Sequence, residues 1–398
     1  MKKAFFIAHR LPFPPNKGDK LRAYHILSCV CQFFETYLFC HLDDKRDLKE
    51  ISRLNFPLKD IFYRFRPARL RKLFCLKALP SGSLTVAYFY EKSLQKKYDY
   101  LLKSVNPSLI FCSCAPAAEY VFRGPPSQAA LFLDFMDVDS EKWQAFAQKT
   151  PWPYKFIYAL EAQRLRAYER QIVQKFHQVF FVSVQEAAIF KAKVSPSPKI
   201  QVLENGVDLS FFNPSYMSSL PKTGPTVVFT GAMDYWPNIE GVLWFTKNCW
   251  PSIKKTCREA TFYIVGKDPP PEIKKLSHRK TGIIVTGFVK DTRDYLALAD
   301  VCIAPLLVAR GVQNKILEAA AMGKPVVATP QAAEGISLVP EKEILIEDKA
   351  SPFAEKIIKL LQRPQLAQKI GGQARQRMEK EYSWEKKLAV LKQILSQI

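Results

Sequence analysis

The chain has 398 residues, 48% of them hydrophobic, a length that favours two or three domains, each with a buried core. Its formal net charge of +22 suits three kinds of partner: nucleic acid, an anionic membrane face or phosphorylated substrates. Nucleic acid is disfavoured, because the lysines are dispersed and no nucleic-acid-binding motif is present. No run approaches the roughly 20 apolar residues of a spanning helix, and nine scattered cysteines without C-x-x-C or zinc spacing indicate reduced, buried thiols in a cytoplasmic protein.

Short apolar runs recur along the first half, separated by helical or loop material. The first run follows Met1 almost at once and ends before a proline cluster, so it predicts a buried strand rather than a signal sequence. The expected strands are Ala4–Ala8, Tyr37–Cys40, Leu109–Cys112, Leu131–Phe135, Val179–Val182 and Ile200–Leu203. Strands that alternate with helices predict a parallel sheet covered on both faces.

The loop after the first predicted strand, HRLPFPPNKGDK from His9 to Lys20, is expected to contact a substrate before a helix begins near Leu21. Ligand sites in such folds lie at the carboxyl ends of the strands. Gly18 permits close approach of the backbone to a ligand, and Lys20 and Arg22 supply cations. A proline-stiffened surface loop with solvated lysines is the structural alternative.

A denser basic segment, YRFRPARLRKLF from Tyr63 to Phe74, alternates basic residues with aromatic or aliphatic ones. Such a stretch suits the surface of an anionic bilayer, where each basic residue contributes about 1 kcal/mol. A basic loop on a basic protein explains the segment equally well. The sequence therefore leaves open whether the protein is peripheral at the inner face of the plasma membrane.

Acidic residues follow the strand predicted at Leu131–Phe135, in the sequence DVDSEKW from Asp137 to Trp143. Three roles suit Asp137 and Asp139: binding or deprotonating a hydroxyl, ligating a hard cation, or capping the next helix. The pattern alone does not choose between them.

A break at 211–225, rich in Pro, Ser and Asn, predicts a linker between two Rossmann-like domains. The first domain is expected at 1–210, with the tail 382–398 added to it, and the second at 226–381. Expected strands of the second domain are Val227–Thr230, Thr261–Val265, Ile283–Thr286, Val301–Ala304, Val326–Ala328 and Ile344–Ile346. No G-x-G-x-x-G follows any strand, which disfavours a dinucleotide dehydrogenase.

The most informative segment runs from Ala304 to Thr329 (APLLVARGVQNKILEAAAMGKPVVAT). It predicts a strand, a loop with Arg310 and Gly311, a helix over 312–322, and a further strand. A helix start presents free N–H groups and partial positive charge, which suit a phosphate. Asn314, Lys315 and Glu318 lie three and four residues apart, and therefore share one face. The opposite face of the helix is apolar and consists of Ile316, Leu317, Ala320 and Ala321.

The run EAAAMGKPVV from Glu318 to Val327 resembles the signature of the retaining GT-B glycosyltransferases of group 1. The resemblance implies two Rossmann-like domains that face each other across a cleft, with a C-terminal helix behind Tyr382-Ser383-Trp384 that crosses back to the first domain. It also implies that Glu318 binds the ribose of the donor nucleotide. A second acid of the family pattern is replaced by Arg310, and related patterns make Arg310 and Lys315 ligands of the diphosphate.

The same resemblance assigns further residues. Gly231 follows the first strand of the second domain, where the family places a glycine near the diphosphate, and Trp236-Pro237-Asn238 stands where a basic pair is usual. Phe288 and Val289 resemble the loop whose backbone recognises the nucleobase. The residues predicted to bind the donor are Gly18, Lys20, Gly231, Phe288, Val289, Arg310, Gly311, Asn314, Lys315 and Glu318.

The resemblance implies roles for Asp137 and Asp139 near the acceptor and for Arg310 in catalysis, without a bound metal or cofactor. The loop at His9 resembles that of sugar transferases from exopolysaccharide loci of exosortase-bearing bacteria. The predicted function is transfer of a sugar from a nucleoside-diphosphate-sugar to a glycan or lipid-linked acceptor, an EC 2.4 activity. The alternatives are a GT-B sugar-nucleotide 2-epimerase and a non-catalytic protein that binds glycan or lipid.

Overall fold

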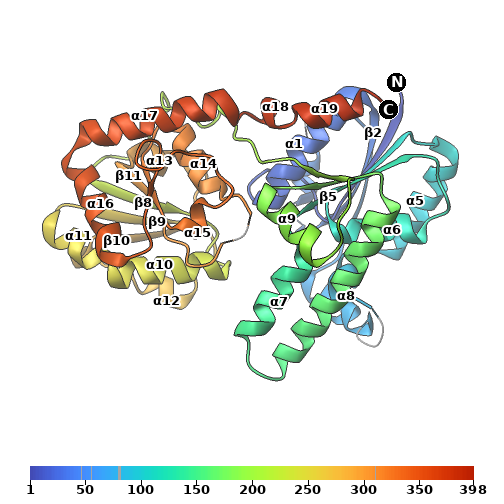
Figure 1. The fold of residues 1–398 in the computed structure, drawn as a ribbon, viewed down its shortest axis with the longest axis horizontal. Coiled ribbons are helices and arrows are strands. Elements are labelled where there is room, and N and C mark those ends of the chain that lie inside the picture. Colours follow the sequence, from blue (N-terminus) through green and yellow to red (C-terminus); the bar gives the residue numbers. More distant parts are fainter. Residues whose placement is uncertain (46, 55, 79–81, 310) are drawn as a thin grey trace. The chain divides into compact units, whose positions relative to one another are not determined.

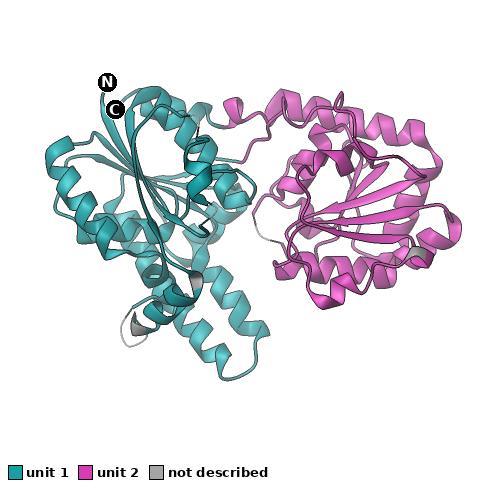
Figure 2. Ribbon diagram, turned by 180° about the vertical axis from the view of Figure 1, so that it is seen from behind, with its two compact units in different colours: residues 1–204, 388–398 teal, residues 205–387 magenta. Residues whose placement is uncertain are grey.

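The computed structural model describes residues 1–45, 47–54, 56–78, 82–309 and 311–398. They form two compact units, residues 1–204 with 388–398, and residues 205–387 (Figure 2). The segment 211–225, expected as a linker, falls within the second unit, as do residues 205–210 and 382–387. No helix among the described residues is both long enough and apolar enough to cross a bilayer.

The first unit is built on a seven-stranded parallel sheet with the order β3-β2-β1-β4-β5-β6-β7 (Figure 1). Its strands are β1 (Lys3–Ala8), β2 (Glu35–Leu42), β3 (Leu58–Phe65), β4 (Leu109–Cys112), β5 (Ala130–Met136), β6 (Gln178–Phe181) and β7 (Ile200–Val202). The six apolar runs of the sequence all form strands. The edge strand β3 was not predicted, because its side chains are half-buried or exposed and its sequence, LKDIFYRF, lacks a clean apolar run.

The described helices of this unit pack against the sheet or project from it (Figure 1). They are α1 (Gly18–Phe33), α2 (Asp47–Ile51), α3 (Ala68–Cys75), α4 (Leu84–Phe89), α5 (Lys92–Val105), α6 (Ala118–Arg123), α7 (Asp139–Lys149), α8 (Tyr154–Lys175), α9 (Val184–Lys193) and α19 (Ala389–Leu395). Helix α1 begins at Gly18, earlier than the expected start near Leu21. Helix α19 returns from the second unit to pack on α1, and the Lys2 ammonium donates to the carbonyl of Ile398.

Arg22 of α1 lies in the core of the first unit and does not face a ligand, contrary to the sequence prediction. Its guanidinium donates to both carboxylate oxygens of Asp134, at 2.6 and 2.7 Å, and to the carbonyl of Leu203 at 2.6 Å. Both charged side chains are essentially inaccessible to solvent. The bidentate geometry compensates the cost of burying the two charges.

The second unit is built on a six-stranded parallel sheet with the order β10-β9-β8-β11-β12-β13. Its strands are β8 (Thr226–Thr230), β9 (Thr261–Val265), β10 (Ile283–Gly287), β11 (Val301–Ala304), β12 (Val326–Ala328) and β13 (Leu345–Ile346). Its helices are α10 (Trp236–Asn248), α11 (Trp250–Thr256), α12 (Pro271–Lys274), α13 (Arg293–Leu298), α14 (Asn314–Ala321), α15 (Pro330–Ala333), α16 (Ala350–Gln362), α17 (Pro364–Glu381) and α18 (Trp384–Lys387). All six predicted strands are present, and the predicted helix over 312–322 is shorter at both ends.

The two chain segments that connect the units are bonded to each other within the second unit. The amide of Val207 donates to the carbonyl of Tyr382 at 2.7 Å, and Val207 forms a parallel bridge with Ser383. A Cβ atom on Gly206 would lie 2.6 Å from the backbone of Trp384, so only glycine allows this close approach. The Asn-Gly-Val-Asp turn and the Tyr-Ser-Trp segment therefore form one structural element.

Candidate functional site

The strand order of the second sheet locates the candidate site. The chain runs from β8 through β9 to β10, and then crosses to β11 on the other side of β8. In open parallel sheets, ligands bind outside the carboxyl ends of the strands where the order reverses in this way. The loop after β8, residues 231–235, and the loop after β11, residues 305–313, therefore border the expected binding crevice.

Helix α14, which follows the second of these loops, has two different faces. One face packs into the core and consists of Ile316, Leu317, Ala319, Ala320 and Ala321. Asn314, Lys315 and Glu318 lie on the other side and are half-buried, which confirms the predicted division of the helix. No side chain among the described residues caps the helix start at Gln313.

Lys315 connects the starts of the two helices that follow these loops, α14 and α10. Its Nζ donates to Oδ1 of Asn238 at 2.6 Å, and it lies 4.4 Å from the centre of the Phe229 ring. Asn238 is itself oriented, because its Nδ2 donates to the carbonyl of Ala232 at 2.8 Å. The Lys315 side chain is thus held near the carboxyl end of β8 by an amide oxygen and an aromatic ring, neither of which carries a charge.

Burial shifts the protonation of both charged groups on α14. It lowers the pKa of Lys315 to about 7 and raises the pKa of Glu318 to about 7, while the attraction between the two groups works against both shifts. A poorly solvated cation beside a poorly solvated acid is typical of sites where ligand groups replace water. Asn314, at the helix start, accepts a hydrogen bond from Asn205 at 3.1 Å.

Glycines bring the backbone close to the crevice. A Cβ atom on Gly231 would lie 2.8 Å from the Asn238 amide, and one on Gly266 would lie 1.7 Å from the carbonyl of Gly231. Gly231 therefore lies directly beside the partner of Lys315. Gly311 has φ of +64°, which favours glycine at the entrance to α14.

The remaining predicted donor residues of this unit lie on the same edge of the sheet or outside the described chain. Gly287 ends β10 with φ of +69°, and Phe288 behind it is exposed while Val289 is half-buried. An exposed aromatic ring at a strand end suits a flat base. Arg310 lies outside the described residues.

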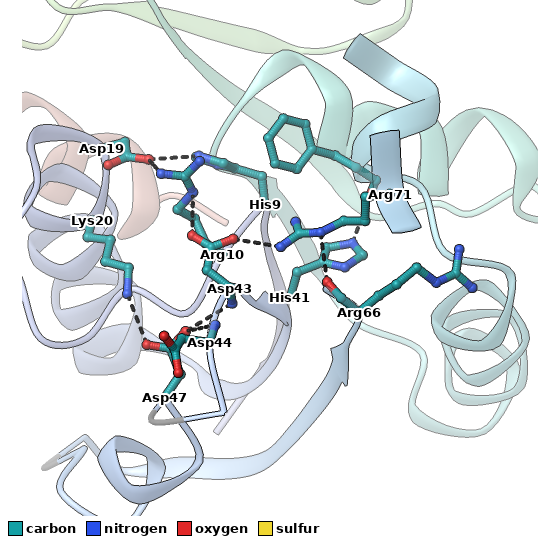
Figure 3. A network of polar contacts seen from close by, with 11 residues as sticks. His9, Arg10, Asp19, Lys20, His41, Asp43, Asp44, Asp47, Arg66 and Arg71 are labelled. Carbon is teal, nitrogen blue, oxygen red and sulfur yellow. Dashed lines mark hydrogen bonds and ion pairs between the residues drawn. The ribbon is translucent and has the colours of Figure 1, made fainter. Parts of the chain in front are cut away.

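The first unit has an equivalent reversal of strand order between β1 and β4, and a polar network lies there (Figure 3). Asp19 accepts from His9 and from Arg10, each at 3.0 Å. Arg10 also lies 3.2 Å from Asp43, which accepts from Arg71 at 2.8 Å. Charges alternate along this chain of contacts, so the charge of Arg10 is compensated within the unit.

His9 is positively charged in this network at neutral pH. Burial works against the charge, but the neighbouring Cys114 and Asp19 outweigh burial and raise the pKa of His9 to about 9. The same contacts hold the pKa of Asp19 below its ordinary range despite burial. His9 and Asp19 are therefore an ion pair at the carboxyl end of β1.

The other candidates of the first unit lie apart from this pair. Gly18 is the exposed first residue of α1, and Lys20 is buried with its Nζ 3.5 Å from Asp47. Asp137 and Asp139 follow the end of β5, and both contact Lys142, at 3.2 and 3.3 Å. Neither aspartate caps α7 by a side-chain hydrogen bond.

The start of α7 is satisfied by two buried acids instead of Asp137 and Asp139. Glu169 accepts from the amide and the hydroxyl of Ser140, at 3.0 and 2.6 Å, and Glu186 accepts from the amide of Val138 at 2.8 Å. The capping role weighed for Asp137 and Asp139 is thereby filled from elsewhere. Their half-exposed carboxylates remain free for another role beside Lys142.

The sequence placed His9 and Asn238 in candidate segments, but it did not indicate the contact of Asn238 with Lys315 or the pairing of His9 with Asp19. Asn238 lies in the first turn of α10, where an asparagine normally indicates only a helix start, and its contact with Lys315 spans 77 residues of sequence. Asp19 and His9 are ten residues apart on different elements. The signal that could have found them is position: all three lie at the ends of strands where the order reverses.

Comparisons with known proteins indicate the family and the fold that the chain resembles. Residues 224–363 match the family model "Glycosyl transferases group 1". The chain is 22% identical over 377 residues to the "Uncharacterized 44.6 kDa protein in cps region" of Klebsiella pneumoniae, covering 90% of each chain. Sucrose-phosphate synthase from Thermosynechococcus elongatus has a similar structure, with a TM-score of 0.71 and 18% identity over 100% of this chain and 99% of that one. HepE of Anabaena, solved with UDP and glucose, gives a TM-score of 0.69 at 14% identity over the whole of both chains.

The two parallel α/β units define a protein of the GT-B fold. The chain carries a group 1 glycosyltransferase domain at residues 224–363, and Lys315, Glu318 and Asn238 all lie inside it.

Proposed function

We propose that this protein is a retaining glycosyltransferase that moves a sugar from a nucleoside-diphosphate-sugar to a glycan or lipid-linked acceptor, in exopolysaccharide or cell-envelope glycan synthesis. The observation that carries the proposal is the arrangement on α14: Lys315 is fixed by Asn238 where the strand order reverses, and Glu318 lies one turn further along the same face. The solved complex of HepE with UDP and glucose and the cps-region relative support this direction.

The proposed chemistry is assigned to few groups. Lys315 and the partial positive charge at the start of α14 stabilise the charge that develops on the departing diphosphate, and Arg310 adds a second cation. Glu318 accepts hydrogen bonds from the ribose hydroxyls, and Phe288 and Val289 contact the base. The leaving phosphate assists in taking the proton of the acceptor hydroxyl, and Asp137 or Asp139 binds that hydroxyl. No resident metal or cofactor is proposed, and the protein is expected to act in the cytoplasm.

A transfer assay tests this proposal. Wild-type protein is incubated with a panel of nucleoside-diphosphate-sugars, with and without lipid and glycan acceptors, and products are followed by mass spectrometry and NMR. The expected result is donor consumption that depends on acceptor, with the anomeric configuration retained. Release of an epimerised sugar from donor alone would identify a 2-epimerase instead. Absence of both reactions and of donor binding would identify a non-catalytic binding protein.

A further inference from the structure

The helical hairpin of α7 and α8 projects away from the sheet of the first unit (Figure 1). Its two helices pack along each other, and the rings of Trp143 and Tyr158 meet between them at 5.1 Å. Helix α8 has 22 residues, roughly 33 Å of helix. The packing makes the hairpin a rigid support for whatever its tip carries.

The tip of this hairpin is aromatic and exposed. Residues 151–156, the sequence PWPYKF, form an unbroken exposed run. Trp152 is 82% exposed, Phe156 68% and Tyr154 57%. Large exposed apolar side chains gathered in one short segment mark an interaction site. The segment ends a projecting hairpin (Figure 1), so its rings can reach into a partner that accepts inserted side chains.

The charge around the tip has one sign. From residue 142 to residue 160 the sequence has three lysines and no acidic residue. Lys149 and Lys155 are exposed beside the aromatic rings. Trp and Tyr beside Lys is the composition of side chains that lie at the boundary between lipid headgroups and acyl chains.

A second surface of the same character is attached to α8. From residue 61 to residue 90 the sequence has six basic residues and no acidic one. Arg69 and Lys72 of α3 are exposed, as are the apolar side chains of Leu70, Leu73 and Phe74. Helix α3 therefore presents basic and apolar groups together, which is the pattern of an interfacial helix.

Buried hydrogen bonds fix this second surface to the hairpin. Glu161 of α8 accepts from the Ser83 hydroxyl and from the amides of Leu84 and Thr85, at 2.6 to 2.8 Å. Arg164 of α8 donates to the carbonyl of Gly82 at 2.8 Å. Glu161 lies two helical turns from the start of α8, so these bonds attach the start of α4 to the hairpin, and α3 packs against α4.

We propose that the tip of the α7–α8 hairpin, with α3 beside it, docks this protein on an anionic lipid bilayer: the rings of Trp152, Tyr154 and Phe156 insert at the headgroup level, and the exposed lysines and arginines pair with lipid phosphates. We favour an anionic bilayer over an acidic protein as the partner. A bilayer accepts inserted aromatic rings and presents phosphates to the basic side chains at the same time. The proposal stands independently of the sugar donor.

Vesicle flotation of the full-length protein tests the proposal. The probes are vesicles of phosphatidylcholine alone and of phosphatidylcholine with phosphatidylglycerol in equal parts. Wild type is expected to float with the anionic vesicles, less so as salt is raised. The double variant Trp152→Ser and Phe156→Ser is expected to bind the vesicles at least about tenfold more weakly, because two rings can no longer insert into the bilayer. The double variant Arg69→Glu and Lys72→Glu is expected to lose the preference for phosphatidylglycerol.

Matched controls separate this surface from general stickiness. Tyr100→Ser removes an exposed ring on α5, and Lys274→Glu with Lys275→Glu reverses two exposed charges in the second unit. Both controls are expected to float as wild type does. Wild type that ignores both vesicles, or a tip variant that floats like wild type, would overturn the proposal. Wild type that binds immobilised polyglutamate but no vesicle would assign the surface to an acidic protein and overturn it too.

Discussion

At the scale of single residues, Glu318 and Lys315 have different expected partners although they lie on one helical turn. The carboxylate suits the ribose hydroxyls, and the ammonium suits the diphosphate. A nucleoside monophosphate and a diphosphate share the ribose but differ in the group that Lys315 would meet. The two roles are therefore separable by experiment.

Glu318→Ala is expected to weaken binding of nucleoside monophosphate and diphosphate alike, by about 1–3 kcal/mol, because ribose contacts are left unmade. Isothermal titration calorimetry of both ligands measures the loss. Glu355→Ala, an exposed acid on α16, is the matched control and should leave both affinities unchanged. Unchanged affinity in Glu318→Ala would remove the ribose assignment.

The His9–Asp19 pair predicts a pH dependence of stability. The pKa of His9 is about 9 in the folded protein and about 6.5 when unfolded, so the folded state binds the extra proton. The stabilisation is complete below pH 6.5 and is lost as pH rises through 9. We expect His9→Gln to be less stable than wild type by about 1–3 kcal/mol at pH 6, and the difference to shrink above pH 9.

Urea unfolding of wild type and His9→Gln across this range measures the effect. Asp19→Asn should reduce the pH-dependent part, because it removes one of the two groups that favour protonated His9, the other being Cys114. A stability difference that stays constant from pH 6 to above pH 9 would show that His9 contributes by packing alone.

At the scale of elements, α17 determines where α14 lies. Arg375 of α17 donates to the carbonyl of Ala321, the last residue of α14, at 2.6 Å. Gly323, with φ of +68°, ends that helix, and Gly371 of α17 approaches it so closely that a Cβ atom would lie 2.0 Å from the Gly323 carbonyl oxygen. The position of Lys315 and Glu318 thus depends on a glycine far along the chain.

The neighbouring glycines of α17 give a matched pair of substitutions. Gly371→Ala is expected to destabilise the protein by about 1–3 kcal/mol, because the new methyl group meets backbone that cannot move away. Gly372→Ala meets open space and should stabilise α17 by about 0.5–1 kcal/mol. Thermal unfolding measures both. Equal effects of the two substitutions would contradict the close approach of α17 to Gly323.

Strands with an unbroken apolar run were predictable from sequence, including the edge strands β7, β10 and β13. Most of the twelve predicted strands are covered on both faces, which gives a continuous apolar signal. Strand β3 was missed because polar residues interrupt its apolar ones, and its last residues were assigned to a basic segment instead. Helix α14 was predicted by its spacing, but its exact ends depend on the loop geometry at Gly311 and Gly323.

At the scale of the whole molecule, the site residues on one helix could be predicted, whereas those that arise from tertiary contact could not. Lys315 and Glu318 follow from helical spacing. Asn238 and the His9–Asp19 pair depend on which strand ends become neighbours, and burial of Arg22 depends on Asp134, 112 residues away. The hairpin that carries the aromatic tip begins at Asp139, one of the two candidate acceptor residues.

The most direct test of the account is binding of nucleoside diphosphates to the second unit's crevice in the full-length protein. Uridine, guanosine, adenosine and cytidine diphosphates are titrated by calorimetry into wild type and into Lys315→Met, with Lys359→Met on α16 as control. We predict that at least one diphosphate binds wild type and the control equally, and that Lys315→Met loses at least about tenfold in affinity. No binding by any of the four, or equal binding to Lys315→Met, would contradict the account.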